Sequence, residues 1–153
     1  MIEPISFFVA GEPKGQPRPR AFARKMGNGK FVARVFDSGT AEAWKSQIAA
    51  EGSKHRPQTP LGGPVSLRIR FYMPRPKGHF VAGKPERGLR PSAPVRHIGK
   101  PDADNLAKAV MDALKQCGWY WLDDAQVVIL TVAKNYSRNC GTGAEIEIGE
   151  VLP

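Results

Sequence analysis

Two short stretches of the chain hold carboxylates at spacings that could bind a metal ion. Asp102 and Asp104 stand two residues apart, Asp123 and Asp124 are adjacent further along, and Lys108 lies between the two pairs. Carboxylate oxygens suit the hard divalent ions Mg²⁺ and Mn²⁺, and carboxylates brought together repel one another unless a cation lies among them. The pattern therefore indicates metal-assisted chemistry, provided that the fold brings the two stretches together.

The first carboxylate stretch is predicted to begin an amphipathic helix. Pro101 suits a helix entry, and nearby carboxylates favour the positive end of the helix dipole. Apolar residues then recur with a helical period and form one stripe, made of Leu106, Val110, Ala113, Leu114 and Cys117. The opposite side carries Asp104, Lys108, Met111 and Lys115, with Asp112 at its edge. Gly118 is typical of a helix end. We expect a helix that packs by one face and displays acids and a lysine on the other.

The second stretch precedes a run of β-branched residues, 126–133, which predicts a buried strand. A short acidic loop between this strand and the helix could fold back onto the helix start, so that three or four carboxylates converge. Two alternatives stay open for these residues. Asp102 and Asp104 could mark a solvated helix cap and Asp123–Asp124 a solvated turn. Lys108 could form an ion pair with Asp104 one turn away, worth only about 0.3–0.5 kcal/mol.

These residues resemble a known family signature. The segments KPDADNLAKAVMDAL (100–114) and WLDDAQVV (121–128) look like those of the RusA endodeoxyribonucleases, the prophage-associated Holliday junction resolvases. The family signature is D-x-D-N-x-x-K on a helix, followed by an L-D-D-x-Q-V turn. The resemblance is dense over residues 100–132 and extends more loosely to the segment G-x-P-x-G-x-x-R-P-R, from Gly11 to Arg20. The chain departs from compact members by a long insertion between Pro74 and Lys100.

The resemblance implies a set of roles for the acidic stretches. Asp102, Asp104 and Asp124 would hold Mg²⁺, for which Mn²⁺ would substitute, and Lys108 would be the catalytic lysine. Asp123 would be a neighbour that binds the metal or supports its ligands. The resemblance also implies a crossover junction endodeoxyribonuclease of DNA recombination and repair. As a homodimer, it would nick two opposed strands of a four-way junction.

The charge of the chain is consistent with a nucleic-acid partner. Its 153 residues include 23 Lys and Arg against 14 Asp and Glu, a net charge of +9. Such a surplus points toward a polyanion, although a basic surface could also serve solubility. Between Lys14 and Arg34 the chain has seven cations and no acid, which suits phosphate contacts or a solvated basic edge strand. The candidate DNA-binding residues are Lys14, Arg18, Arg20, Arg24, Lys25, Arg68, Arg70, Arg75, Lys77 and Lys100.

The rest of the pattern predicts a single α+β domain over residues 1–153. Strands are expected at 5–10, 21–25, 30–36, 65–73, 126–133 and 144–151, and a first helix is expected to end near Lys54 with Ser38 or Thr40 as its cap. The strand at 65–73 alternates, so that Arg68 and Arg70 point away from its apolar face. The last strand would close a mixed sheet antiparallel to the strand before it, with two main helices packed against the sheet. Trp119, Tyr120 and Trp121 could pack in the core, join two copies or stack on unpaired bases.

The basic, Pro- and Gly-rich insertion at about 74–99 is too long for an ordinary connection. We expect a mobile flap near the acids that becomes ordered on nucleic acid; the alternative is a tolerated insertion without a role. His79 and His97 within it are poor metal candidates. Cys117 and Cys140 make no disulfide framework, and no apolar run approaches the roughly 20 residues that a membrane helix needs. A soluble protein of a bacterial or phage-infected cytoplasm is expected.

Three functional hypotheses follow from the sequence. The first is a metal-dependent endonuclease that resolves four-way junctions. The second is a related nuclease that acts on flaps or forks, because the insertion could change the substrate preference. The third is a non-catalytic DNA-binding protein whose acids are structural.

Overall fold

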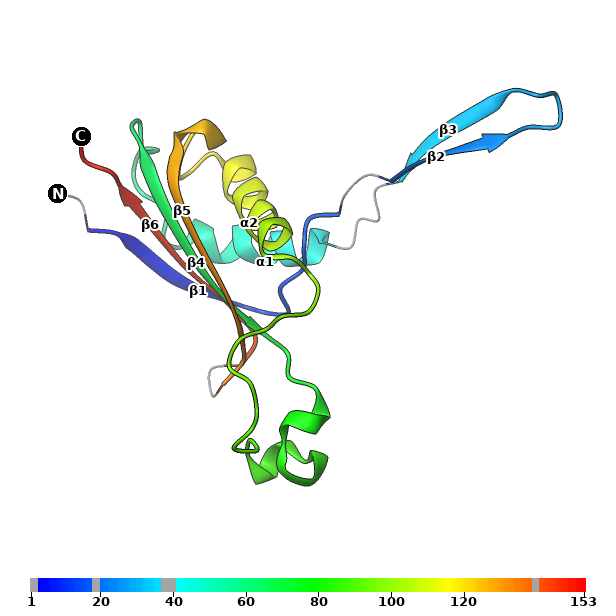
Figure 1. Cartoon of the computed structure of the whole chain (residues 1–153). Coiled ribbons are helices and arrows are strands. Elements are labelled where there is room, and N and C mark those ends of the chain that lie inside the picture. Colours follow the sequence, from blue (N-terminus) through cyan, green and yellow to red (C-terminus); the bar gives the residue numbers. More distant parts are fainter. Residues whose placement is uncertain (1–2, 18–19, 37–40, 139–140) are drawn as a thin grey trace.

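The centre of the computed structural model is a mixed four-stranded sheet in the order β1-β6-β4-β5. Its strands are β1 (Ile5–Ala10), β4 (Val65–Met73), β5 (Val127–Tyr136) and β6 (Gly143–Glu150). Strand β6 is antiparallel to both of its neighbours, whereas β4 and β5 are parallel. Helices α1 (Glu42–Ser53) and α2 (Ala103–Cys117) lie on the same side of this sheet (Figure 1). The predicted α+β fold is confirmed. The structure describes residues 3–17, 20–36, 41–138 and 141–153, without the side chains of 20–24 and 31–36.

The core forms where the apolar stripes of both helices meet one face of the sheet. Alternate side chains of β4 are buried there, namely Val65, Leu67, Ile69, Phe71 and Met73. Four members of the predicted α2 stripe are also buried, namely Leu106, Val110, Ala113 and Leu114. Cys117 is half-buried, and its thiol donates to the carbonyl oxygen of Ala113. Gly118 ends α2 with a φ of 65°, a left-handed conformation that glycine adopts without strain. Alternation and helical period therefore predicted this packing correctly.

The position of the last strand differs from the simplest expectation. β6 runs antiparallel to β5 but pairs with β1 and β4, so it lies in the middle of the sheet. In this position Ile146 stands beside Phe7 of β1 and Ile69 of β4. A strand whose inward residues are all apolar gains more burial between two neighbours than at an edge.

The expectation of a buried strand at 126–133 was wrong in one respect. β5 is an edge strand, and three consecutive side chains near its start are exposed: Val128 by 57%, Ile129 by 50% and Leu130 by 46%. Within the described part of the chain, only its end has a second neighbour, because Tyr136 N–H donates to Val95 O and His97 N–H donates to Lys134 O. An apolar run indicates burial without identifying the partner that provides it.

Strands β2 (Arg20–Lys25) and β3 (Phe31–Phe36) form a separate two-stranded sheet. The turn is closed by a hydrogen bond from Met26 N–H to Lys30 O, as the predicted hairpin requires. Figure 1 shows this hairpin reaching away from the four-stranded sheet. After it, α1 begins with Ala41 as its N-cap residue, and the predicted caps Ser38 and Thr40 lie outside the described residues.

The insertion at 74–99 has more structure than its composition indicates. It contains three single-turn 3₁₀ helices, η1 (Lys77–His79), η2 (Val81–Gly83) and η3 (Pro85–Arg87). The Arg75 guanidinium donates to Ser137 O and Pro94 O and lies 5.1 Å from the centre of the Tyr136 ring. His79 and His97 contact the same ring edge-on. The insertion is thus fastened to the C-terminal end of β5, below the sheet in Figure 1. None of the described helices has the length and apolar character needed to span a bilayer.

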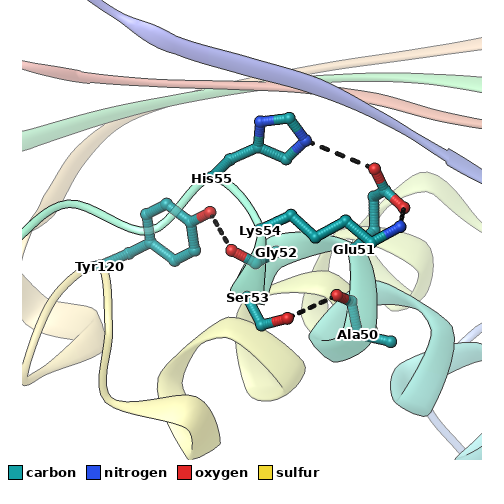
Figure 2. A network of polar contacts seen from close by, with 7 residues as sticks. All are labelled: Ala50, Glu51, Gly52, Ser53, Lys54, His55 and Tyr120. Carbon is teal, nitrogen blue, oxygen red and sulfur yellow. Dashed lines mark hydrogen bonds and ion pairs between the residues drawn. The ribbon is translucent and has the colours of Figure 1, made fainter.

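The segment after α2 joins the two helices. Tyr120 and Trp121 are fully buried, so for these two residues core packing is confirmed. The Tyr120 hydroxyl donates to Gly52 O in the last turn of α1, at 2.7 Å (Figure 2). Burial raises the pKa of Tyr120 well above its usual range, which keeps the hydroxyl protonated as a donor. Trp119 is half-buried, with the Arg56 guanidinium over its ring.

We expect Tyr120→Phe to lower the free energy of unfolding by about 0.5–1.5 kcal/mol, because Gly52 O would lose its buried hydroxyl donor and keep only the His55 N–H, at 3.2 Å. Urea denaturation followed by circular dichroism measures this change. Ser53→Ala is the matched control, since it removes a neighbouring hydrogen bond to Ala50 O whose carbonyl lies within the helix (Figure 2). An equal loss in both variants would contradict a special role for the Tyr120 contact.

Candidate active site

The outer face of α2 borders a cavity of about 500 Å³ between this helix and β5. Three residues at helical spacing, Asp104, Lys108 and Asp112, line one side. Asp124 lines it from the segment before β5, and Leu130 and Val132 of β5 contribute to its apolar part together with Ala103, Ala107 and Met111 of α2. The cavity therefore combines three carboxylates with one ammonium group, as expected for a site that attracts a cation.

Asp124 owes its position to a tightly bonded turn. It begins η4 (Asp124–Gln126), and the Asp123 carboxylate caps this turn by accepting from Ala125 N–H at 2.9 Å. The Gln126 side chain accepts from the N–H groups of Leu122 and Asp123, and it donates to Leu61 O. These contacts explain the L-D-D-x-Q-V pattern: Asp123 and Gln126 build the turn, and Asp124 faces the cavity.

A buried indole orients the Asp124 carboxylate. Trp121 Nε1 donates to Asp124 Oδ1 at 2.9 Å, and the Trp121 side chain is fully buried. A neutral donor fixes the carboxylate without cancelling its charge. Asp124 can therefore still attract a cation.

Asp102 lies at the start of α2 but outside the residues that line the cavity. It is the N-cap residue, and both of its carboxylate oxygens accept from Lys100 Nζ, at 2.8 and 2.9 Å. The sheet holds the segment just before Asp102, because Lys134 Nζ on β5 donates to the carbonyl oxygens of Gly99 and Pro101. The strand that borders the cavity thus also positions the start of the motif.

The structure brings together part of the predicted site. Asp104, Asp124 and Lys108 meet at the cavity, whereas Asp102 pairs with Lys100 and Asp123 caps the turn. Among the described residues, no three acidic, histidine or cysteine side chains gather closely enough to form a metal cage. The donor set nevertheless fits a hard divalent ion, because the carboxylates lining the cavity supply only oxygen ligands.

Sequence reasoning placed Asp112 at the edge of the outer helix face but did not count it among the site residues. Lys108 Nζ lies 3.8 Å from Asp112 Oδ1, and the Asp112 side chain is only 22% exposed. The signal was available, since Asp112 follows Lys108 by four residues and so lies on the same helix face. Asp112 limits where the Lys108 ammonium can lie.

The N-terminal motif lies against the start of α2. Gln16 N–H donates to Asn105 O at 2.9 Å. A Cβ atom on Gly15 would lie 3.1 Å from Pro101 Cβ and 3.2 Å from Asn105 Cβ, closer than ordinary van der Waals contact. Glycine at this position therefore lets the segment that leads into the basic hairpin approach the motif helix.

The predicted DNA-binding residues occupy different surroundings. Arg68 and Arg70 pair with Glu147 and Glu145 across the sheet face that the helices leave open. Lys14 pairs with Glu12, and Lys100 and Arg75 make the contacts given above. Lys25 and Lys77 are exposed. Arg18 lies outside the described residues, as do the side chains of Arg20 and Arg24 on β2.

Comparison with known proteins gives a consistent result. The family model of the endodeoxyribonuclease RusA matches residues 10–149. The uncharacterised protein YqaN of Bacillus subtilis (strain 168) is 40% identical over 151 residues, 96% of each chain. The crossover junction endodeoxyribonuclease RusA of Escherichia coli (strain K12) is 33% identical over 101 residues, or 59% of this chain and 65% of its own. The RusA of Enterobacteria phage 82 is 34% identical over the same shares.

An α+β domain of net positive charge with three aspartates around one cavity has the features of a metal-assisted nuclease. The family match extends over most of the chain, and the protein belongs to the RusA endodeoxyribonuclease family. The family and the enzyme class predicted from sequence are thereby confirmed. The matched region spans 65% of the RusA chains named above.

We expect Gly15→Ala to weaken DNA binding, because the added methyl group forces the N-terminal segment away from Pro101 and Asn105. The strain should also lower the free energy of unfolding by about 1–3 kcal/mol. Fluorescence anisotropy with labelled branched DNA, together with thermal unfolding, measures both effects. Gly62→Ala is the control, since a Cβ there would meet nothing within 4 Å. Unchanged DNA affinity in Gly15→Ala would show that the close approach has no part in binding.

Proposed function

We propose that this protein is a Mg²⁺-dependent, structure-specific endonuclease that resolves Holliday junctions by paired symmetrical nicks. It would act as a homodimer on branched DNA in recombination and repair, in the cytoplasm of a bacterial or phage-infected cell. The observation that carries the proposal is the cavity where Asp104, Asp112 and Asp124 meet Lys108. The names of the RusA relatives support the choice of a four-way junction as substrate.

Hydrolysis of a phosphodiester needs a positioned water, relief of charge on the phosphoryl oxygens and a stabilised leaving oxygen. A bound divalent ion supplies Lewis acidity for these needs. Asp104 and Asp124 would hold the ion from two sides of the cavity, and Asp102 would join them after leaving Lys100. Mn²⁺ is expected to substitute for Mg²⁺, because both prefer oxygen ligands.

The Lys108 ammonium would lie beside the scissile phosphate and offset the negative charge that develops on it. Asp112 would orient this ammonium from the next turn of α2. The Trp121 indole would keep Asp124 in its orientation while DNA binds. Each of these roles uses a contact already present in the protein.

The acidic cavity would repel DNA if the surrounding surface were neutral. The chain compensates with nine more positive than negative charges, several of them on the N-terminal segment and hairpin that lead from the start of α2. Lysine and arginine there would hold phosphates without reading sequence. The acids could then act on a backbone bound by other residues.

Two other functions would use the same surfaces. A flap or fork nuclease would keep the acidic site and differ in substrate, which the insertion at 74–99 could determine. A non-catalytic DNA-binding protein would use the acids only to cap and orient α2 and η4. The contacts of Asp102 and Asp123 favour this last reading for those two residues but do not account for Asp104, Asp112 and Asp124 around one cavity.

The decisive experiment compares labelled four-way junction, linear duplex and flap substrates, each with Mg²⁺ and with EDTA. Symmetrical nicks on the junction, abolished by EDTA, are expected. Cleavage of flaps in preference to junctions would retain the metal site and change the substrate. Tight binding without cleavage in either Mg²⁺ or Mn²⁺ would leave a DNA-binding protein.

Asp104→Asn and Asp124→Asn should each reduce junction cleavage by at least about a hundredfold, because each removes a charged ligand of the ion. Junction affinity in EDTA should stay within about threefold, since the phosphate contacts lie elsewhere. Single-turnover cleavage and gel-shift titration measure the two quantities. Glu86→Gln, in the exposed part of the insertion, is the control for loss of one negative charge. If the two aspartate variants cut normally, the acids are not catalytic.

Asp112→Asn should have an intermediate effect, lowering the cleavage rate about tenfold while affinity for DNA and metal changes little. The reason is that Asp112 acts through the position of Lys108 rather than on the ion. The rate should be measured against Mg²⁺ concentration. A raised Mg²⁺ requirement with an unchanged maximal rate would instead identify Asp112 as a metal ligand.

A further inference from the structure

Ile98 lies near the end of the insertion, just before the start of α2, and its side chain is 95% exposed. Figure 1 shows this end of the insertion leading up to α2 in yellow-green. Of the described large apolar side chains none is more exposed, and Leu122 comes next at 70%. A single apolar side chain in solvent is common and needs no partner on that ground alone. The case for a partner therefore depends on how Ile98 is held and on what surrounds it.

The backbone on both sides of Ile98 is fastened to one residue of β5. His97 N–H donates to Lys134 O at 3.1 Å, and Lys134 Nζ donates to Gly99 O at 2.6 Å. The His97 ring also lies edge-on to Tyr136, with 4.9 Å between the ring centres. Isoleucine is branched at Cβ, which restricts its own rotation. Ile98 is therefore held on a fixed loop, so that binding through it costs little conformational entropy.

Positive charge surrounds this loop. The chain has no acidic residue from 87 to 101. The lysine and arginine side chains of this stretch are all exposed, namely Arg87, Arg90, Arg96 and Lys100. An apolar tip between cations suits a ligand that carries phosphates and apolar faces together, as nucleic acid does. Leu122 differs in this respect, because it lies beside Asp123 and Asp124, whose negative charges repel phosphate.

Ile98 also lies close to the acids in the chain. Asp102 follows it by four residues, so the two backbones are at most about 14 Å apart. Asp104, which lines the cavity, stands two residues beyond Asp102. Because a duplex rises about 3.4 Å per base pair, Ile98 can reach DNA within a few base pairs of a phosphate held at the acids. A side chain in this position can respond to the structure of the DNA next to the cleaved bond.

Stacking of the bases decides which DNA structure can accept the Ile98 side chain. In an uninterrupted duplex the neighbouring pairs cover both faces of each base pair, so an apolar side chain must first unstack one step. The cost of unstacking is similar in size to the free energy gained by burying one isoleucine side chain. At a branch point the stack is already interrupted, and the side chain can cover an exposed base face at lower cost. The net gain is therefore confined to branched DNA.

We propose that Ile98 packs on the exposed face of a base pair at the branch point of DNA and so favours branched substrates over linear duplex. Its ligand is the apolar face of a nucleobase, and the cations beside it hold phosphates of the same strands. This role rests on the proposed function, because it needs branched DNA bound beside the acidic cavity. It differs from the phosphate contacts, which do not distinguish one duplex from another.

Fluorescence of 2-aminopurine at the branch point tests the contact, because stacking on a neighbouring base quenches this base analogue. The labelled four-way junction is titrated with the full chain in Ca²⁺, which folds the junction and is a poor substitute for Mg²⁺ in geometry. Wild type should brighten the analogue at least about threefold more than Ile98→Ala, since the larger side chain keeps the neighbouring base away. Ile98→Leu should retain most of the increase. Circular dichroism confirms that the variants fold.

Affinity separates this role from general DNA binding. Ile98→Ala should weaken binding of the four-way junction about tenfold, the loss expected when most of one isoleucine side chain is no longer buried. The affinity for linear duplex should change by less than about twofold, because the phosphate contacts remain. Gel-shift titration of both substrates in EDTA measures these quantities. Leu152→Ala is the matched control, an aliphatic side chain with 59% exposure near the end of the chain, and should leave both affinities unchanged.

Two outcomes distinguish the contact from the nuclease. If the wild type cleaves junctions while Ile98→Ala gives the same base fluorescence and junction affinity, the contact is overturned and the proposed function remains. If the fluorescence increase depends on Ile98 but no DNA is cleaved in Mg²⁺, the proposed nuclease is refuted and the contact remains. A wild type that binds no branched DNA would overturn both.

Two further outcomes would assign Ile98 to a different partner. An equal loss of junction and duplex affinity in Ile98→Ala would identify a general DNA contact and overturn the role at the branch point. Weaker self-association of Ile98→Ala in analytical ultracentrifugation, with unchanged base fluorescence, would show that a second copy covers the side chain and would overturn the proposal as well.

Discussion

The architecture depends on the incomplete cover that two helices give to one face of a four-stranded sheet. α1 packs over β1 and against α2, and α2 reaches toward β5 without covering it (Figure 1). The apolar stripe of α2 can be buried only on the inner strands, so its charged face opens toward the uncovered strip of β5. The cavity lies in this strip, between Asp104, Lys108 and Asp112 on one side and Leu130 and Val132 on the other. A third helix over β5 would bury the strip and remove the site.

Segments distant in sequence meet at the start of α2, and each makes a contact that the others need. The N-terminal segment approaches through Gly15 and bonds to Asn105, Lys134 of β5 holds the carbonyls before Asp102, and Lys100 neutralises Asp102. The acids therefore do not stand alone at a helix terminus. They stand where the basic N-terminal segment and the edge strand are both fastened, so the geometry of the carboxylates depends on both of these segments.

Local pattern was sufficient wherever one element determined the outcome. The period of α2, its end at Gly118, the alternation of β4 and the hairpin turn at Met26–Gly29 could all be predicted, because each depends on neighbours within a few residues. The place of β6 between β1 and β4 could not be predicted in this way. An alternating pattern shows that one face of a strand is buried, but it does not identify the neighbouring strands. The helical period placed Asp112 near Lys108, but it was given no role because the family signature ends at Lys108. The insertion was underestimated because its stability comes from Tyr136, far away in sequence, around which Arg75, His79 and His97 gather.

The error over β5 carries the most physical information. A run without charge indicated burial on both sides, and the chain alone provides a neighbour on one side only. Residues 95–97 pair with β5 only from Lys134 to Tyr136, and the uncharged run 127–132 lies before that point. The covered half of this edge therefore carries the lysine, and the half without cover is the apolar one. The lysine of this strand, Lys134, stands in the covered half, where it donates to the carbonyl oxygens of Gly99 and Pro101 just before Asp102. The same strand therefore holds the start of the motif through its covered half and borders the cavity with the apolar residues of its other half.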